Sequence, residues 1–325
     1  SGHQLCYWTR CPLSAPSSFA TGVTTISSIR ARFDGATRYL LYPLFAAATL
    51  TYLAYELNGP RASIGHLYGW YVGALVVLMV LIESAHALRA EWRMTWASFW
   101  RRDLPFLVVG ASTIALANWV ALRIVTEHAM TPGRALAQVA VVPGVIVSLL
   151  VTDFLWYWVH RLSHEARGRT GRWLWRVHVA HHLPKQVYVL MHAIGHPINA
   201  IVVRAILTIR PFLMGFSSEV VFAAGVVTEL QGLVSHFNVD SRVGWLNYLL
   251  VGTELHRYHH SADPAEAKNF GAVVSVWDQL FGTFVYRPVE APHALGIDDP
   301  AQYPADTQLL SVLALPLRRS PATGA

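Results

Sequence analysis

Four long apolar runs constrain the fold of this chain more than any other feature of its sequence. They occupy residues 39–57, 64–88, 104–125 and 139–159. Each run has about the 20 residues that an α-helix needs to cross the hydrocarbon core of a bilayer, and each is hydrophobic on all sides rather than along one stripe. Only 14% of the 325 residues are charged, whereas soluble domains have about 25%. We therefore expect an all-α membrane protein with about four transmembrane helices.

The arginines between these runs indicate the orientation of the helices. Arg30, Arg32 and Arg38 precede the first run, a group of four lies between the second and third runs, and a group of five follows the fourth, whereas the other two loops are poor in arginine. The positive-inside rule then places the N-terminus, the second loop and the segment after His160 on the cytoplasmic side. The net charge of +6 is explained by this pattern, and we expect no nucleic-acid partner, because the basic residues form no stripe.

The rest of the chain shows no internal repeat and no domain boundary. We expect an N-terminal tail over 1–33, which lacks the apolar core of a signal peptide, and one membrane-embedded domain over 34–290. Proline and glycine cluster after Tyr286, which predicts an irregular C-terminal tail over 291–325. Two later apolar stretches, 198–216 and 220–233, fit either a re-entrant hairpin or another pair of spans.

Histidine is the second unusual feature, because 11 of the 16 histidines lie between residues 160 and 260. The sequence reads HRLSH at 160–164, HVAHH at 178–182 and HRYHH at 256–260, and His236 stands alone. Residues three or four apart share a face of a helix, so the histidines of each group converge. A single histidine is usually an ordinary polar side chain, but so many unliganded imidazoles beside a bilayer would be costly to bury.

These histidines therefore predict a metal centre. The predicted ligands are His160, His164, His178, His181, His182, His236, His256, His259 and His260. One structural zinc ion takes four ligands, so eight or nine histidines indicate two metal ions. Imidazole binds iron, zinc, copper and nickel alike. The HExxH motif of zinc hydrolases is absent, and Glu165 points about 100° away from His164 on a helix, so we interpret it as solvated.

The three groups, in this order, resemble the histidine boxes of the fatty acid hydroxylase/sterol desaturase superfamily, which consists of integral-membrane di-iron oxidases. HRLSH matches the HRxxH box, and the other two groups match the HxxHH boxes. The segments NFG at 269–271 and WDQLFGTF at 277–284 resemble the closing signature of the superfamily. The resemblance covers about residues 140–290, and it implies a cytoplasmic helical cap that carries the histidine cluster over 150–285.

The resemblance implies two iron ions, O2 as co-substrate and a lipid substrate. It further implies an external electron donor of the cytochrome b5-like, ferredoxin or reductase type, because no fused haem domain is visible. The expected reaction is hydroxylation of an unactivated C–H bond in a sterol or fatty acyl lipid. A desaturase would use the same site, and a non-redox membrane protein that binds zinc is the alternative from another class. Zinc could also replace iron during purification.

The resemblance also implies residues around the ligands that temper the charge of the metal pair. Asp153 and Asn238 are candidates for this role, and for Asp153 the alternative is an interfacial ion pair with Arg161 or another arginine. His196, in a His-Pro pair, is expected to support the site, and His192 is a further candidate ligand.

The arginines of the sequence also bear on partners and location. Those between Arg167 and Arg176 could dock an acidic redox protein, or could simply reflect the positive-inside rule and attraction to membrane lipids. The preference for arginine over lysine and the lack of a retention signal favour a bacterial inner membrane over the endoplasmic reticulum, with the active site on the cytoplasmic face.

Overall fold

The structure is a computed structural model, and it describes residues 20–60, 63–127 and 135–318. The long helices are α1 (Ala20–Asn58), α2 (Tyr68–His86), α4 (Leu104–Glu127), α5 (Val141–Glu165), α7 (Pro197–Met214) and α8 (Ser218–Ser235). The shorter helices are α3 (Trp96–Ser98), α6 (Gly168–His178), α9 (Thr253–His259), α10 (Val276–Leu280) and α11 (Leu309–Leu313). The described residues form no β-strand and only isolated bridges, such as the one between Ala87 and Val239. The all-α prediction is confirmed.

Four segments of the structure are long and apolar enough to cross a membrane. They are Thr37–Asn58, Tyr68–His86, Ala90–Ile124 and Val141–Glu165. Large apolar side chains point outward from them: on α4, Leu116, Trp119 and Leu122 are about 60% exposed. An apolar surface of this extent would be unfavourable in water and is suited to lipid. The predicted four candidate spans are thus confirmed, and the helices are those of a membrane protein.

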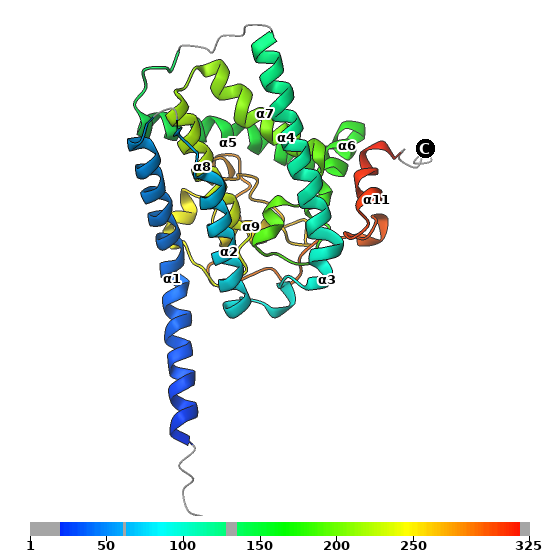
Figure 1. The fold of residues 1–325 in the computed structure, drawn as a ribbon. Helices are drawn as coiled ribbons and strands as arrows, with labels where there is room; N and C mark the ends of the chain where they lie inside the picture. Colours follow the sequence, from blue (N-terminus) through cyan, green and yellow to red (C-terminus); the bar gives the residue numbers. More distant parts are fainter. Residues whose placement is uncertain (1–19, 61–62, 128–134, 319–325) are drawn as a thin grey trace, which may run out of the picture.

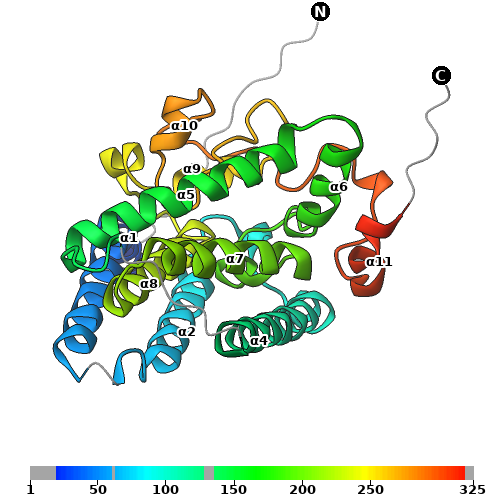
Figure 2. The ribbon, with the colours of Figure 1, turned by 90° about the horizontal axis from the view of Figure 1, so that it is seen from above.

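The long helices run in two directions. Figures 1 and 2 show α1, α2 and α4 running in roughly the same direction, while α5 and α7 run across them. α5 packs against both α6 and α8, and α7 packs against α4. α5 therefore connects the apolar helices to the part of the chain that carries the histidines.

The two later apolar stretches form a helical pair, α7 and α8. The turn between them contains Gly215, which has a φ of 73°, a conformation that glycine adopts without steric cost. Ser217 then caps α8 by accepting a hydrogen bond from the backbone of Val220. Only Pro197–Leu207 qualifies as a shorter apolar helix among the described residues. The re-entrant character of the pair stays a prediction.

The structure describes part of each segment that the sequence predicts to be a tail. α1 begins at Ala20, ahead of the first apolar run, and residues 1–19 lie outside the described part of the chain. Near the other end, Val312 and Leu315 are buried in a cluster with Phe106 and Met191. The apolar run at 309–317 explains this docking, because its side chains gain free energy when they leave water.

One arginine of the second loop does not lie on a membrane surface. Arg102 is only 2% exposed, and it forms ion pairs with Asp103 and Asp306. The hydroxyl of Tyr188 is also bonded to it. This network ties the start of α4 to the C-terminal segment, so Arg102 has a structural role within the fold.

Candidate metal centre

All nine predicted ligands meet in the structure, and they form two groups. The first consists of His160, His164, His178, His182 and His259, and the second of His181, His236, His256 and His260. Within each group, every residue offers a ligand atom within 4.8 Å of the others. Two groups of five and four imidazoles match the expectation of two metal ions.

The second and third histidine boxes each contribute to both groups. α6 ends at His178, and the chain continues as a 3-10 turn over Val179–His181. This change of pitch separates His181, in the second group, from His182, in the first. On α9, His256 and His260 face the second group, whereas His259 faces the first. The spacing of the histidines correctly predicts that the three boxes meet. The prediction that all three histidines of an HxxHH box converge on one face is wrong for both boxes, because each box divides its histidines between the two groups.

Hydrogen bonds to the Nδ1 atoms orient the imidazoles. In the first group, Nδ1 of His160 lies 2.7 Å from the carbonyl oxygen of Phe270, and Nδ1 of His259 lies 2.9 Å from that of Lys268. In the second group, Nδ1 of His181 lies 2.8 Å from the carbonyl of Ile194. A carbonyl only accepts, so these Nδ1 atoms carry the hydrogen and each Nε2 keeps a free lone pair for a metal.

The Nε2 atoms face one another at distances that suit a shared ion. In the first group, Nε2 of His178 lies 3.0 Å from Nε2 of both His160 and His182. In the second group, Nε2 of His236 lies 3.0 Å from that of His256. At a metal–nitrogen distance of about 2.1 Å, two ligands at right angles lie about 3.0 Å apart. Lone pairs that face each other in this way repel unless a cation sits between them, so the residues present fit a metal.

Burial keeps these imidazoles neutral. Burial lowers the pKa of His182, His259 and His260 well below the ordinary value of 6.5, and the charges of neighbouring histidines lower it further. The pKa of His181 falls to about 4 for the same main reason. A metal ligand must be unprotonated, and at neutral pH this requirement is met without any cost of removing protons.

The loop that supplies the carbonyl of Phe270 is held by buried polar side chains. Asp278 accepts hydrogen bonds from the backbone of Phe270 at 2.7 Å and Gly271 at 2.8 Å. Asn269 has a φ of 60°, and its side chain donates to the carbonyls of Leu255 and Val285. A Cβ on Gly271 would lie 2.3 Å from a backbone oxygen, so only glycine fits there. The closing signature thus positions a histidine, a role that sequence reasoning missed.

Asp153 also binds this loop. Its carboxylate accepts hydrogen bonds from the backbone of Ala272 at 2.9 Å, Val273 at 2.8 Å and Val274 at 3.4 Å. Arg161 pairs with Glu165 and not with Asp153. Asp153 therefore holds the backbone of the loop, and among the described residues it forms neither a hydrogen bond to a histidine nor the ion pair with Arg161 that was the alternative.

The other expected supporting residues lie near the two groups without joining them. The side chain of Asn238 bonds the backbone of Arg89. His196 accepts from the backbone of Ile198 at the start of α7, and its Nε2 bonds the carbonyl of Leu313. His192 lies 3.9 Å from the carboxylate of Glu229 and belongs to neither group. Asn238 and His196 thus hold neighbouring backbone segments, whereas His192 lies beside Glu229 of α8.

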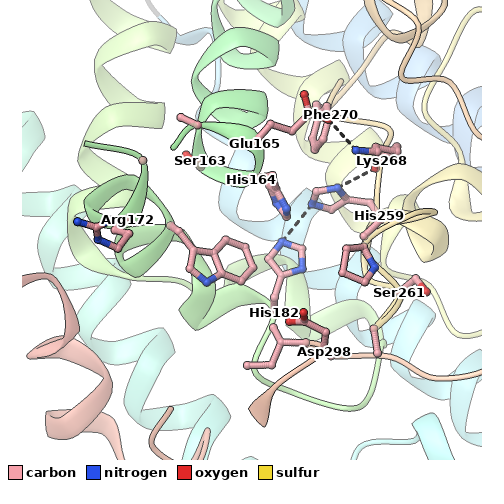
Figure 3. A pocket seen from close by; sticks show the side chains of 18 residues that line it. Ser163, His164, Glu165, Arg172, His182, His259, Ser261, Lys268, Phe270 and Asp298 are labelled. Atoms are coloured by element: carbon pink, nitrogen blue, oxygen red, sulfur yellow. Dashed lines mark hydrogen bonds and ion pairs between the residues drawn. The ribbon is translucent and has the colours of Figure 1, made fainter. Parts of the chain in front are cut away.

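A cavity of about 360 Å³ opens beside the first group. Figure 3 shows His164, His182 and His259 pointing toward one another at its inner end. At its rim, Nζ of Lys268 pairs with Glu165 at 2.7 Å. Glu165 is therefore ion-paired rather than merely solvated. The cavity lies beside three histidines of the first group and is lined by both polar and apolar side chains.

The fold and the site together define an all-α membrane protein with a two-part histidine centre. The fatty acid hydroxylase family model matches residues 145–283, a stretch that contains all nine histidines. This part of the chain is a fatty acid hydroxylase domain, and the resemblance seen in the sequence is confirmed. No solved structure matches the chain.

Three curated proteins illustrate the range of the relatives. Ornithine lipid hydroxylase OlsE of Rhizobium tropici is 36% identical over 154 residues, which cover 47% of this chain and 45% of that protein. Very-long-chain aldehyde decarbonylase GL1-10 of Oryza sativa subsp. japonica is 26% identical over 60% of this chain and 64% of its own length. Methylsterol monooxygenase 2-2 of Arabidopsis thaliana is 24% identical over 43% and 51%. The chain spans about half the length of these relatives.

Proposed function

We propose that this protein is a membrane-bound, O2-dependent di-iron hydroxylase that acts on an unactivated C–H bond of a lipid. The observation that carries the proposal is the pair of histidine groups, whose Nε2 lone pairs face one another at about 3 Å inside a fatty acid hydroxylase domain. Bound iron would supply the activation of O2 and the oxidation of the C–H bond.

The protein itself would contribute orientation and exclusion of water. Phe270 and Lys268 would keep His160 and His259 in the tautomer that binds metal, through their backbone carbonyls. The buried histidines would remove bulk water from the reacting atoms, which strengthens the electrostatic interactions of a site. The apolar outer surfaces of the spanning helices would keep a lipid substrate close to the centre.

The active site would lie on the cytoplasmic side and receive electrons from an external donor. Figure 1 places the lower part of α1, the end of α2 and the start of α4 at the lower end of the molecule, and the arginines near these helix ends support a cytoplasmic location for that end. Arg172 and Trp175 line the cavity beside the first group. We propose that a cytochrome b5-like protein, a ferredoxin or a reductase docks there. The bacterial relative favours an inner membrane.

The names of the relatives support a lipid substrate, since they include an ornithine lipid hydroxylase and a methylsterol monooxygenase. Desaturation would use the same two groups of histidines. The product separates the two reactions, because hydroxylation adds one oxygen atom and desaturation removes two hydrogen atoms.

The proposal is tested with protein purified from a membrane and loaded with iron. It is supplied with lipid extract, a reductant and isotopically labelled O2, and the lipids are analysed by mass spectrometry. We expect a lipid that carries one labelled oxygen atom, and no product from His182→Ala or His259→Ala. The matched control is His293→Ala, which changes an exposed histidine outside both groups. Full activity of either cluster variant, or activity without O2 and reductant, contradicts the proposal and favours the zinc-binding alternative.

A further inference from the structure

A second cavity, of about 220 Å³, lies beside the last turn of α2. It is lined by Glu83, Ser84, Arg93 and Asn238 on its polar side and by Val80 and Met94 on its apolar side. None of these residues belongs to the two histidine groups. Pockets that enclose drug-sized ligands measure roughly 300–1,000 Å³, so this cavity suits a small polar group rather than a whole lipid.

Glu83 is a buried carboxylate that lacks a counter-ion. It is 7% exposed, and its Oε1 accepts hydrogen bonds from the backbone of Val189 at 2.9 Å and Asn238 at 2.6 Å. Its other oxygen, Oε2, has no hydrogen-bond partner, and the carboxylate forms no ion pair, among the residues that the structure describes. The charge of Arg257 acts on it, but that guanidinium donates to the carbonyls of Phe237 and Val239. Burial disfavours the charged form of an unpaired carboxyl group, and a cationic group beside Oε2 would stabilise that charged form.

Arg93 provides the opposite charge on the same cavity. Its side chain is exposed, and in the described parts of the chain its guanidinium has no hydrogen-bond or ion-pair partner. Its backbone is held in place, because Gln186 donates to the Arg93 carbonyl at 3.0 Å. A cation at the rim and a buried carboxyl group in the interior, neither of them ion-paired among the described residues, together match the two charges of a zwitterion.

The cavity lies beside the end of a candidate membrane span. Glu83 is in the last turn of the span Tyr68–His86, where an apolar helix leaves the hydrocarbon core. The segment that follows Arg93 exposes two tryptophans, Trp96 at 72% and Trp100 at 61%. Exposed tryptophans of this kind concentrate at membrane–water interfaces.

We propose that this cavity binds the zwitterionic headgroup of an amine-bearing lipid, with its ammonium group at Oε2 of Glu83 and its anionic group at Arg93. The inference rests on the proposed function, because it takes this lipid to be the substrate. Asn238 lies two residues after His236, and Val189 begins the 3-10 turn that runs to Ala193. A headgroup held at Glu83 would therefore be anchored beside the second histidine group, and the apolar side of the cavity would lead the acyl chains back to lipid.

The test is equilibrium binding to the detergent-solubilised protein, measured by native mass spectrometry. The probes are phosphatidylethanolamine and phosphatidylglycerol of the same short chain length. The variants are Glu83→Gln, which keeps an oxygen for the two backbone N–H groups, and Arg93→Gln, which changes an exposed side chain. Glu91→Gln is the matched control, because Glu91 is exposed nearby and does not line the cavity.

We expect the unmodified protein and Glu91→Gln to bind phosphatidylethanolamine more tightly than phosphatidylglycerol. Glu83→Gln should weaken binding of phosphatidylethanolamine by about tenfold, as expected for the loss of a charged hydrogen bond, with no effect on phosphatidylglycerol. Equal binding of the two lipids, or unchanged binding in both cavity variants, overturns the inference. Competition by soluble phosphoethanolamine at the same affinity would assign the cavity to a free zwitterion and would also overturn it.

The binding measurement is independent of turnover. A protein that selects the amine-bearing lipid but oxidises no lipid would refute the proposed function and leave the headgroup site standing. A protein that hydroxylates lipids without regard to the headgroup would refute the headgroup site and leave the proposed function standing.

Discussion

Nδ1 of His160 lies 2.7 Å from the backbone carbonyl oxygen of Phe270, a residue 110 positions further along the chain. This bond joins the fourth apolar helix to the loop of the closing signature. The loop in turn is held by Asp153 and Asp278. Asp153 and Asp278 lie outside both histidine groups. Through the loop, they fix the orientation of the His160 imidazole and therefore of its Nε2 atom.

Asp278→Asn is expected to weaken metal binding although Asp278 touches no histidine. An amide can accept only on one side, so a backbone N–H of Phe270 or Gly271 loses its partner and the loop moves. Loss of a residue that orients a ligand typically costs about 10- to 100-fold in metal affinity. The measurement is a metal titration followed by elemental analysis. Asp263→Asn, which lies outside the loop, is the control, and equal affinity of the two variants contradicts the role given to Asp278.

The two histidine groups are expected to lose metal separately. His164→Ala removes a residue of the first group and His236→Ala one of the second, so each should lower the metal content by about half. Elemental analysis of the purified variants measures this. A single variant that removes all of the metal, or neither variant removing any, would refute two separate sites. His293→Ala again serves as the control.

The metal-free protein is expected to become less stable as the pH falls below neutrality. The unfolded chain's histidines titrate near 6.5, whereas burial lowers the pKa of His181 to about 4 and of His182 and His259 still more clearly below 6.5. Between these values the unfolded state binds more protons, so the free energy of unfolding falls as protons are added. The slope is about 1.4 kcal/mol per pH unit for each histidine.

Thermal unfolding of the metal-free protein from pH 7.5 to 5 checks this sign. The melting temperature should decrease steadily over that interval, and metal should suppress the decrease because it binds only the neutral imidazoles. A melting temperature that rises on acidification would mean that the histidines are not buried in the folded state.

Removal of the ion pair between Arg102 and Asp306 is expected to destabilise the fold without changing the histidine groups. Arg102 is buried, so Asp306→Asn leaves part of its charge unsatisfied, at a cost of about 1.5–3 kcal/mol. The melting temperature of the solubilised protein measures this, with the exposed Asp298→Asn as control. Normal metal content together with a lowered melting temperature is the expected combination.

The sequence was sufficient to predict the four candidate spans and the meeting of the nine histidines, because both depend on the spacing of residues that are close together in the chain. The division of the histidines into two groups was not predictable, since it depends on the change from helix to 3-10 turn after His178 and on how α9 meets α6. The contacts of the Phe270 and Lys268 carbonyls with histidines could not be predicted either. Every residue has a carbonyl, and only the folded chain shows which ones meet a histidine.

Asp153 shows a different limit of the sequence. A carboxylate in an apolar helix is expected to have a special role. Its partners, however, are backbone N–H groups about 120 residues away, and no side-chain pattern points to them. A buried carboxylate needs hydrogen bonds that replace those it loses with water. Only the tertiary structure shows which groups donate these bonds to Asp153.

The docking of the C-terminal segment has a consequence for how the protein folds. The cluster of Val312 and Leu315 with Phe106 and Met191 joins residues from before, within and after the stretch 145–283 that matches the family. The cooperative folding unit is therefore larger than the stretch that matches the family. A shortened polypeptide that ends at the family boundary would expose the apolar floor beneath the second histidine box, and aggregation rather than a minimal enzyme is the outcome to expect.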